Sequence, residues 1–203
     1  MAETTLNQLA ASIARRAGLY AAGTATAGTT TTLTDANLIQ PDNLWNNCYV
    51  HFLSGTYAGQ ERLISTFDQD TATITFAPAL AGAVASGMTY EICPLQRADI
   101  HQAIEDAIRR AGQTWQGTQL LADSTDTLSI GEPAERQALA FVEEYALHLV
   151  HEMLMARNVT GEMARVHLSL SNNHLKKAEA LLEKRDPNRE PRTMRTWRVG
   201  GQV

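Results

Sequence analysis

Aromatic residues are scarce in this sequence of 203 residues, at 6% of the chain. A hydrophobic core must therefore be built mainly from Leu, Ile, Val and Ala side chains. No apolar run approaches the roughly 18 residues that a membrane-spanning helix needs, so we expect no membrane partner. The first five residues are polar and acidic, which does not fit the basic and then apolar pattern of a secretory signal peptide.

The sequence motifs of nucleophilic, nucleotide-dependent and redox catalysis are missing as well. There is no Gly-x-Ser-x-Gly elbow, no Gly-x-x-x-x-Gly-Lys phosphate loop and no Gly-x-Gly-x-x-Gly turn. Cys48 and Cys93 lack a Cys-x-x-Cys spacing and lie in expected strands. In a reducing compartment such cysteines are more often small buried side chains than a disulfide. We therefore expect neither an enzyme nor a cofactor.

Charge is distributed unevenly along the chain, although the net charge is only −5. Residues 21–94 carry one basic residue, Arg62, against six acidic residues. Residues 95–186 carry ten basic and fourteen acidic residues, whereas residues 187–203 carry four arginines and one glutamate. The body is thus acidic and the last segment basic, an asymmetry that is typical of a tail that docks on another molecule.

Four stretches repeat apolar residues every three to four positions, as an amphipathic helix does. They are residues 6–20, 97–112, 132–158 and 162–185. The third stretch is apolar around much of its girth, so we expect it to be the central helix. Pro133 at its start loses no hydrogen bond in the first turn of a helix, and Gly161 marks the bend before the fourth stretch.

Residues 23–95, between the first two of these helices, have the composition of short strands. The threonine-rich run 23–34 suits a strand because β-branched side chains pack well on a pleated surface. Further apolar or alternating segments follow, and turns that contain Gly, Pro or Asp separate them. Together with the threonine-rich run they predict about five or six strands. These other segments are 48–53, 60–67, 71–76 and 88–94. Strands this short predict a small antiparallel β-barrel or sandwich.

Two glycines interrupt the middle of this β-rich stretch, in Ser54-Gly55-Thr56-Tyr57-Ala58-Gly59. Glycine adopts positive φ without a steric cost, so the spacing predicts a tight and exposed connection between strands. An exposed connection is a place where a partner can bind. The candidates for contact with a partner are Ser54, Gly55, Thr56, Tyr57 and Gly59.

The whole pattern predicts an α+β protein in four parts. Residues 1–22 form an N-terminal helix that packs on a helical bundle, and residues 23–95 form an inserted β domain. Residues 96–186 supply the three other helices of the bundle. Residues 187–203 form an extended C-terminal arm, because their prolines, arginines and glycines cannot bury a core.

One group of side chains on the expected central helix has the spacing of metal ligands. Glu144, His148, His151 and Glu152 are three or four residues apart and therefore lie on adjacent turns. Their order, His-x-x-His-Glu, is neither the His-Glu-x-x-His of zinc proteases nor the inverted His-x-x-Glu-His. We favour half-buried histidines with Glu–His pairs along one helix, and expect no metal.

The basic segment 187–203 allows three interpretations. Four arginines and Trp197 suit phosphate contact and base stacking, but the segment has no lysine and the acidic body behind it repels a duplex. A second interpretation is a peptide that inserts into a groove of a partner, with apolar anchors and a charged rim. Met194 and Trp197 would be the anchors, and the rim would be Arg192, Arg195 and Arg198. A plain disordered terminus is the third interpretation.

Two features of the chain resemble the head-to-tail adaptor, or connector, proteins of tailed bacteriophages. One is the three-helix segment 97–185 followed by an arm rich in Pro and Arg. The other is a set of short sequence segments in the β-rich stretch, which are similar to segments of the small β domains of phage neck and other virion proteins. These segments are Trp45, Ser54-Gly55-Thr56, Ala58-Gly59-Gln60, Thr73-Ile74-Thr75-Phe76-Ala77-Pro78-Ala79-Leu80 and Gly87-Met88-Thr89-Tyr90-Glu91-Ile92.

The resemblance implies a homo-oligomeric ring, of about twelve copies, below the portal of the capsid. Such a ring belongs to the neck of the virion, is assembled in the host cytoplasm, and lets DNA pass during ejection. The implied partners are the portal protein, further neck or tail proteins, other copies of the chain, and passing DNA bound without sequence specificity. The implied portal-binding arm contains Arg189, Arg192, Met194, Arg195, Trp197 and Arg198.

The acidic body agrees with a conduit, because a basic lining would hold a polyanion that has to slide. The alternative is an oligomeric binding module whose β domain recognises a carbohydrate or a host surface. Exposed aromatic side chains in the β domain would favour this alternative.

Overall fold

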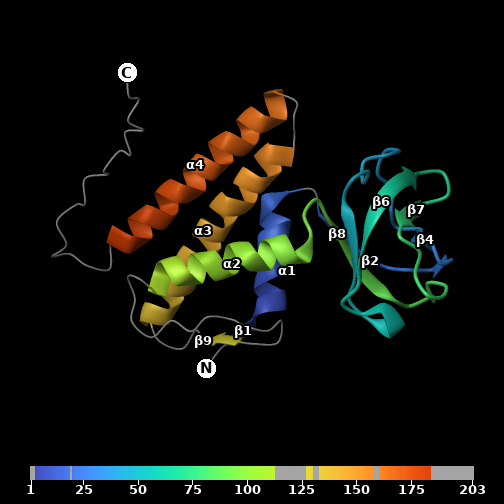
Figure 1. The fold of residues 1–203 in the computed structure, drawn as a ribbon, viewed down its shortest axis with the longest axis horizontal. Coiled ribbons are helices and arrows are strands. Elements are labelled where there is room, and N and C mark those ends of the chain that lie inside the picture. The colour runs from blue at the N-terminus through green and yellow to red at the C-terminus, as the bar shows by residue number, and fades with distance from the viewer. Residues whose placement is uncertain (1–2, 19, 113–126, 130–132, 158–160, 184–203) are drawn as a thin grey trace, which may run out of the picture.

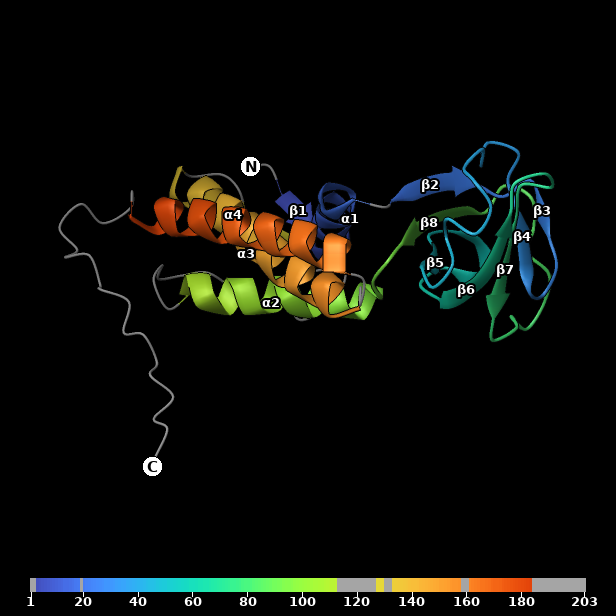
Figure 2. The same ribbon diagram turned by 90° about the horizontal axis from the view of Figure 1, so that it is seen from above.

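The computed structural model describes residues 3–18, 20–112, 127–129, 133–157 and 161–183. These residues form an α+β fold with four α-helices and a seven-stranded antiparallel sheet. The helices lie together at one end of the molecule and the sheet at the other (Figures 1 and 2). The α+β class that the sequence predicts is therefore confirmed.

The four helices all begin and end close to the predicted positions. Their bounds are Leu6–Ala17 for α1, Arg97–Gly112 for α2, Pro133–Arg157 for α3 and Gly161–Glu183 for α4. Helices α1, α2 and α4 each pack against α3, which confirms α3 as the central helix. Figure 1 shows α3 and α4 side by side as a hairpin, with α2 crossing α3.

Helix α1 illustrates why these boundaries are readable from sequence. Thr5 and Gln8 form a capping box, in which the Thr5 hydroxyl accepts from the Gln8 amide and the Gln8 side chain accepts from the Thr5 amide. Gly18 ends the helix with φ of +89°, a conformation that glycine adopts readily. The expected apolar stripe is buried, namely Leu6, Leu9, Ala10, Ile13, Ala14 and Ala17.

The core of the helical part is built largely from aliphatic side chains, as the scarcity of aromatic residues requires. Helix α2 contributes a stripe of fully buried residues in which isoleucine and alanine alternate, namely Ile100, Ala103, Ile104, Ala107, Ile108 and Ala111. The alanines let α2 approach α3 closely. Phe141 and Val142 of α3 lie in the same core.

The large sheet contains seven short strands in the order β2-β8-β5-β6-β7-β4-β3. Their bounds are Ala21–Thr24 (β2), Ala27–Gly28 (β3), Thr32–Thr34 (β4), Tyr49–Phe52 (β5), Glu61–Asp68 (β6), Thr73–Ala77 (β7) and Thr89–Cys93 (β8). We call residues 21–93 the β module. The single threonine-rich strand expected at 23–34 is divided into three strands by two changes of direction.

The sheet of the β module is not closed into a barrel. Its two edge strands, β2 and β3, are consecutive in the chain and do not pair with each other. The residues between them reach both edges, because the Ala25 amide donates to the Met88 carbonyl and the Thr26 amide to the Thr34 carbonyl, both at 2.8 Å. The bend between β2 and β3 thus holds the two edges near each other without a continuous ladder.

A buried carboxylate supports this bend. Asp35 is 1% exposed and accepts from the Tyr90 hydroxyl at 2.8 Å and from the Thr24 amide at 3.2 Å. Burial, together with the hydrogen bond to Asp35, raises the pKa of Tyr90, so the phenol stays a donor. Gly23 lies so close that an added Cβ would be 2.2 Å from the Asp35 carboxylate, which excludes a larger residue there.

A second, two-stranded sheet joins distant parts of the sequence beside the helices. Strand β1 (Glu3–Thr5) pairs antiparallel with β9 (Thr127–Ser129), with Thr4 opposite Leu128. This pairing attaches the segment between α2 and α3 to the N-terminal side of α1. Neither strand is predicted from the sequence.

The β module and the helices meet at a junction of buried charges. Arg97, the first residue of α2, forms an ion pair with Glu91 of β8, and both side chains are nearly inaccessible. The Tyr20 hydroxyl donates to the same carboxylate at 3.0 Å, and the Arg97 amide donates to Glu61 of β6 at 2.7 Å. The start of α2 is therefore attached to two strands of the sheet.

A second arginine closes the other side of this junction. Arg157, at the end of α3, donates to the Pro94 carbonyl and, at 2.9 Å, to the Tyr49 hydroxyl. Its guanidinium also lies over the Tyr49 ring, 5.2 Å from the ring centre. Two helices thus hold the β module by contacts that need specific side chains.

We expect Arg97→Met to destabilise the protein by about 3–5 kcal/mol, because it leaves the Glu91 carboxylate buried without a cation. Arg109→Met is the matched control, since Arg109 is half-exposed and pairs with Glu105 and Asp106 on the surface of α2. That change should cost less than about 1 kcal/mol. Urea unfolding followed by circular dichroism measures both, and equal losses would contradict a role of the buried pair.

Candidate functional site

Four histidines face one another between α3 and α4. His148 and His151 come from α3, three residues apart, and His167 and His174 come from α4, seven residues apart. These spacings place each pair on one face of its helix. All four side chains are at most 8% exposed, so the hairpin of α3 and α4 encloses a polar layer.

The histidines are arranged in a connected network. Direct contacts across the hairpin include His148 Nδ1 to Ser171 Oγ at 2.7 Å and His151 Nδ1 to His167 Nδ1 at 3.2 Å. The rings of His151 and His174 are stacked, with centres 5.4 Å apart and an interplanar angle of 8°. One ring nitrogen of His151, Nε2, is buried without a hydrogen-bond partner.

A carboxylate joins this network to α1. Glu144 Oε2 lies 2.7 Å from His174 Nδ1, and its other oxygen accepts from Arg16 of α1. Burial raises the pKa of Glu144, but the hydrogen bonds from His174 and Arg16 outweigh it and bring this pKa below its ordinary value. The charge of Glu144 is thus retained and links α1, α3 and α4.

The four candidate metal ligands do not come together. Glu144 pairs with His174, whereas Glu152 is half-exposed and lies 3.8 Å from His148 Nε2. Among the residues with described positions, no three His, Cys, Asp or Glu side chains are placed to hold a metal ion. The favoured interpretation, Glu–His pairs beside semi-buried histidines, fits this geometry.

Sequence reasoning on α3 alone missed the partners on α4. The available signal was the spacing of His167, Ser171 and His174 by four and three residues, which puts polar side chains on the face of α4 that packs against α3. A polar face of this kind is matched by polar groups of the opposite helix, because buried polar atoms need partners.

Burial opposes protonation of two histidines in this layer. Burial, followed by the nearby His174, His167 and His148, lowers the pKa of His151 from 6.5 to about 4. Burial likewise lowers the pKa of His167. At the junction, burial, Arg97 and His51 lower the pKa of His101 to about 4, although Glu61 opposes this. At acid pH a positive charge would therefore form on His151 and His101, whose surroundings disfavour it.

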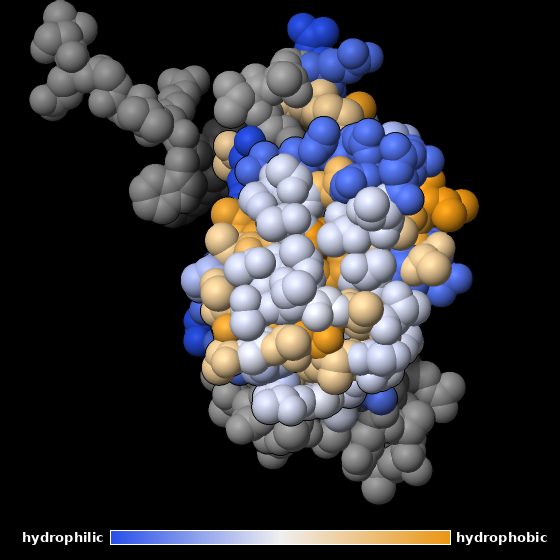
Figure 3. Space-filling view, turned by 90° about the vertical axis from the view of Figure 1, so that its right-hand side faces the viewer, coloured by the Kyte–Doolittle hydropathy of each residue, from blue (hydrophilic) through white to orange (hydrophobic). Residues whose placement is uncertain are grey.

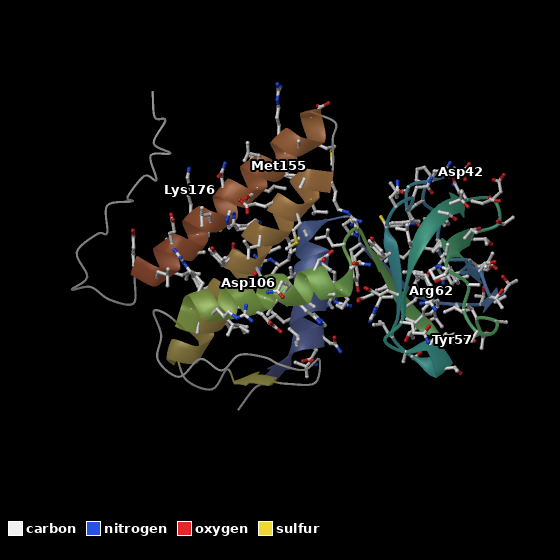
Figure 4. The ribbon with its side chains drawn as sticks, in the orientation of Figure 1. Asp42, Tyr57, Arg62, Asp106, Met155 and Lys176 are labelled. Atoms are coloured by element: carbon white, nitrogen blue, oxygen red, sulfur yellow. The ribbon has the colours of Figure 1, made fainter. Side chains whose placement is uncertain are left out.

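The predicted contact loop of the β module is partly exposed. Gly55 and Gly59 have φ of +77° and +83° and are exposed together with Thr56, as the sequence indicates. Ser54 is held inward because its hydroxyl accepts from the Thr89 amide at 2.8 Å. Tyr57 is buried, at the edge of the β module in Figure 4, and packs edge-on against Phe52.

The aromatic side chains of the β module serve its core. The buried ones are Trp45, Phe52, Tyr57, Phe67, Phe76 and Tyr90. Tyr49 is half-buried, and its hydroxyl accepts a hydrogen bond from Arg157. Figure 3 looks onto the outer end of the β module, where mildly polar residues dominate and apolar ones are scattered. Within residues 21–93 no aromatic side chain is therefore exposed as a platform for a sugar.

The two cysteines are buried and free, which confirms their interpretation as small core side chains. Burial raises the pKa of Cys48 to about 11 and that of Cys93 to about 12, so both remain unreactive thiols at neutral pH. The arm residues Arg189, Arg192, Met194, Arg195, Trp197 and Arg198 lie outside the described residues.

Apolar side chains are exposed on α4. Met163, Val166, Leu168 and Leu170 are each 37–49% exposed, and they lie on the half of α4 nearest its start. Helix α4 packs mainly on α3, which covers only one of its faces. Lys176, further along α4, projects outward from the helical part (Figure 4). The chain therefore presents exposed apolar side chains on the first half of α4.

Comparisons with protein-family models, with curated proteins and with solved structures find no match. Within the described residues, no helix combines the length and the apolar character that crossing a bilayer requires. The site must therefore be interpreted from its own geometry: a layer of buried histidines inside the helices, a junction of buried charges, and exposed apolar side chains on α4.

We expect stability to fall as the pH is lowered from about 6.5 to 4, because in this range the unfolded histidines bind protons that folded His151 and His101 exclude. His151→Gln should reduce this loss by about 1–3 kcal/mol. Urea unfolding of the wild type and the variant at pH 7 and pH 4.5 measures the difference. An equal loss in both proteins would show that His151 does not carry the effect.

Proposed function

We propose that this chain is a virion structural protein, a head-to-tail adaptor of a tailed bacteriophage. Copies of it form a ring below the portal, join the capsid to the tail, and leave a channel through which DNA passes. The helical bundle forms the body of the ring, the β module projects from it as a barrel-like block, and residues 187–203 are the arm that engages the portal.

The exposed apolar surface of α4 is the observation that carries this proposal. A chain that works alone rarely leaves Met163, Val166 and Leu170 exposed together on one face of a helix. In a ring, each subunit buries such a surface against a neighbour, and the same heterologous contact is repeated around the axis. The helices supply a rigid surface for this contact, since α3 holds the other three.

Charge supports the same assignment. Residues 21–94 carry a net charge of −5 and the final segment a net charge of +3. An acidic body does not retain DNA in a channel, whereas a basic arm with Trp197 and Met194 suits a groove on a different protein. The partners that follow are the portal protein, further neck or tail proteins, and other copies of the chain.

No catalytic step is part of this proposal, because multivalent contact performs the work. The alternative, a module whose β part recognises a carbohydrate or a host surface, is less well supported. It needs exposed aromatic side chains, and those of the β module pack into its core or against Arg157. The contact candidates that remain accessible there are Gly55, Thr56 and Gly59.

Deleting residues 187–203 should abolish co-assembly with the portal protein of the same phage while leaving the helices and the sheet intact. The described cores contain no residue beyond 183, so the circular dichroism spectrum should not change. Pull-down with the purified portal measures binding. The double change Met194→Ala and Trp197→Ala should weaken binding at least about tenfold, whereas Thr193→Ala serves as the control. Unchanged binding of the deleted chain would reject the arm.

A further inference from the structure

Two hollows lie along the same side of α4, on one flank of the α3–α4 hairpin, and we call this flank the groove. The first, of about 520 Å³, lies where the start of α4 meets the end of α1 and the loop before β5. The second, of about 310 Å³, lies between the later part of α4 and the first half of α3. Together they form a surface that no described segment covers.

The first hollow is apolar. Leu154 of α3 and Met163, Val166 and Leu170 of α4 line it. Three of these side chains, those of α4, are 37–49% exposed, so a ligand could remove a substantial apolar area from water. The hollow is large enough for a bulky aromatic or thioether side chain.

The second hollow is acidic at its base. Glu143 and Glu144 line it, and Arg16 of α1 pairs with both, at 3.2 Å from Glu143. Burial, and to a smaller extent Glu144, raises the pKa of Glu143, although Arg16 opposes this. Lys177 lies at the exposed rim of the hollow. A guanidinium entering from solvent would find a half-buried carboxylate.

The spacing of the two hollows fits a short extended peptide. Met163 and Lys177 mark their positions along α4 and are 14 residues apart, or roughly 21 Å in a helix. Arg192 and Trp197 are five residues apart in the sequence, which is roughly 17 Å in an extended chain. The two lengths are similar, so an extended chain with Arg192 in the acidic hollow brings Trp197 to the apolar hollow.

The chain itself continues next to the acidic hollow. Helix α4 ends at Glu183, two residues after Leu181, which lines this hollow. Twenty residues follow, enough to reach roughly 65 Å when extended. Eight residues lie between Glu183 and Arg192, which leaves room for the chain to reverse direction and return along the groove.

We propose that this groove is a binding site for a basic peptide with an aromatic anchor, and that residues 192–199 of the same chain occupy it until a partner takes them up. The inference rests on the proposed role of residues 187–203 as an arm, and adds where the arm lies before assembly. A tethered segment binds at a high effective concentration, so a weak contact is sufficient.

Disulfide trapping in the full-length chain tests this site. Val166→Cys with Thr196→Cys places one thiol in the groove and one beside Trp197. The control, Leu168→Cys with Thr196→Cys, uses a residue of the same helix with nearly equal exposure, 46% against 45%, that does not line the groove. Cys48 is buried but lines the first hollow, so both pairs are made in a chain that carries Cys48→Ala and Cys93→Ala.

Under mild oxidation we expect at least about fivefold more disulfide within one chain for the Val166 pair than for the Leu168 pair. Glu143→Lys should reduce the yield for the Val166 pair. Non-reducing gels and mass spectrometry of linked peptides measure both. Equal yields for the two pairs would overturn the site, and disulfides between two chains would place the arm in the groove of a second copy and overturn the intramolecular contact.

No portal is present in this experiment, so its failure is distinct from a failure of the proposed function. Trapping of the arm together with unchanged portal binding by the chain lacking residues 187–203 would support the groove and reject the portal-binding arm. Loss of portal binding without trapping would support the adaptor and reject the groove.

Discussion

The buried ion pair between Arg97 and Glu91 determines how the two halves of this protein are joined. A charge is stable inside a protein only with a partner, so the first turn of α2 must stay against β8. Arg157 adds a second attachment at the end of α3. The β module is therefore held by two helices rather than by a flexible linker. The proposed adaptor needs such a rigid attachment if the β module is to keep a fixed place relative to the ring.

The same need for partners shapes the helical part. Four buried histidines lie between α3 and α4, and Glu144 ties them to Arg16 of α1. This layer fixes the register of the hairpin in a way that aliphatic contacts alone do not, since polar atoms have few satisfactory arrangements. Because α4 is held on one face, its other faces remain available for a neighbouring copy and for the groove along its flank.

Local patterns made much of the fold predictable. Three-to-four-residue periodicity located all four helices, and turn residues located the strands from residue 48 onward. Contacts between distant residues were not predictable. The sequence did not show that residues 21–28 bend between two sheet edges, that Glu91 meets Arg97, or that His151 meets His167. Tyr57, selected for its place between two glycines, is a core residue because Phe52 packs against it.

The assignment as an adaptor is tested most directly by locating the protein in the assembled particle. Virions carrying a tagged copy of this chain would be labelled with gold and imaged by negative-stain electron microscopy, with cryo-electron microscopy of the neck to resolve its symmetry. The account predicts label at the portal vertex and a ring of about twelve subunits between capsid and tail. Label at the tip of a tail fibre would contradict it and favour a host-binding module.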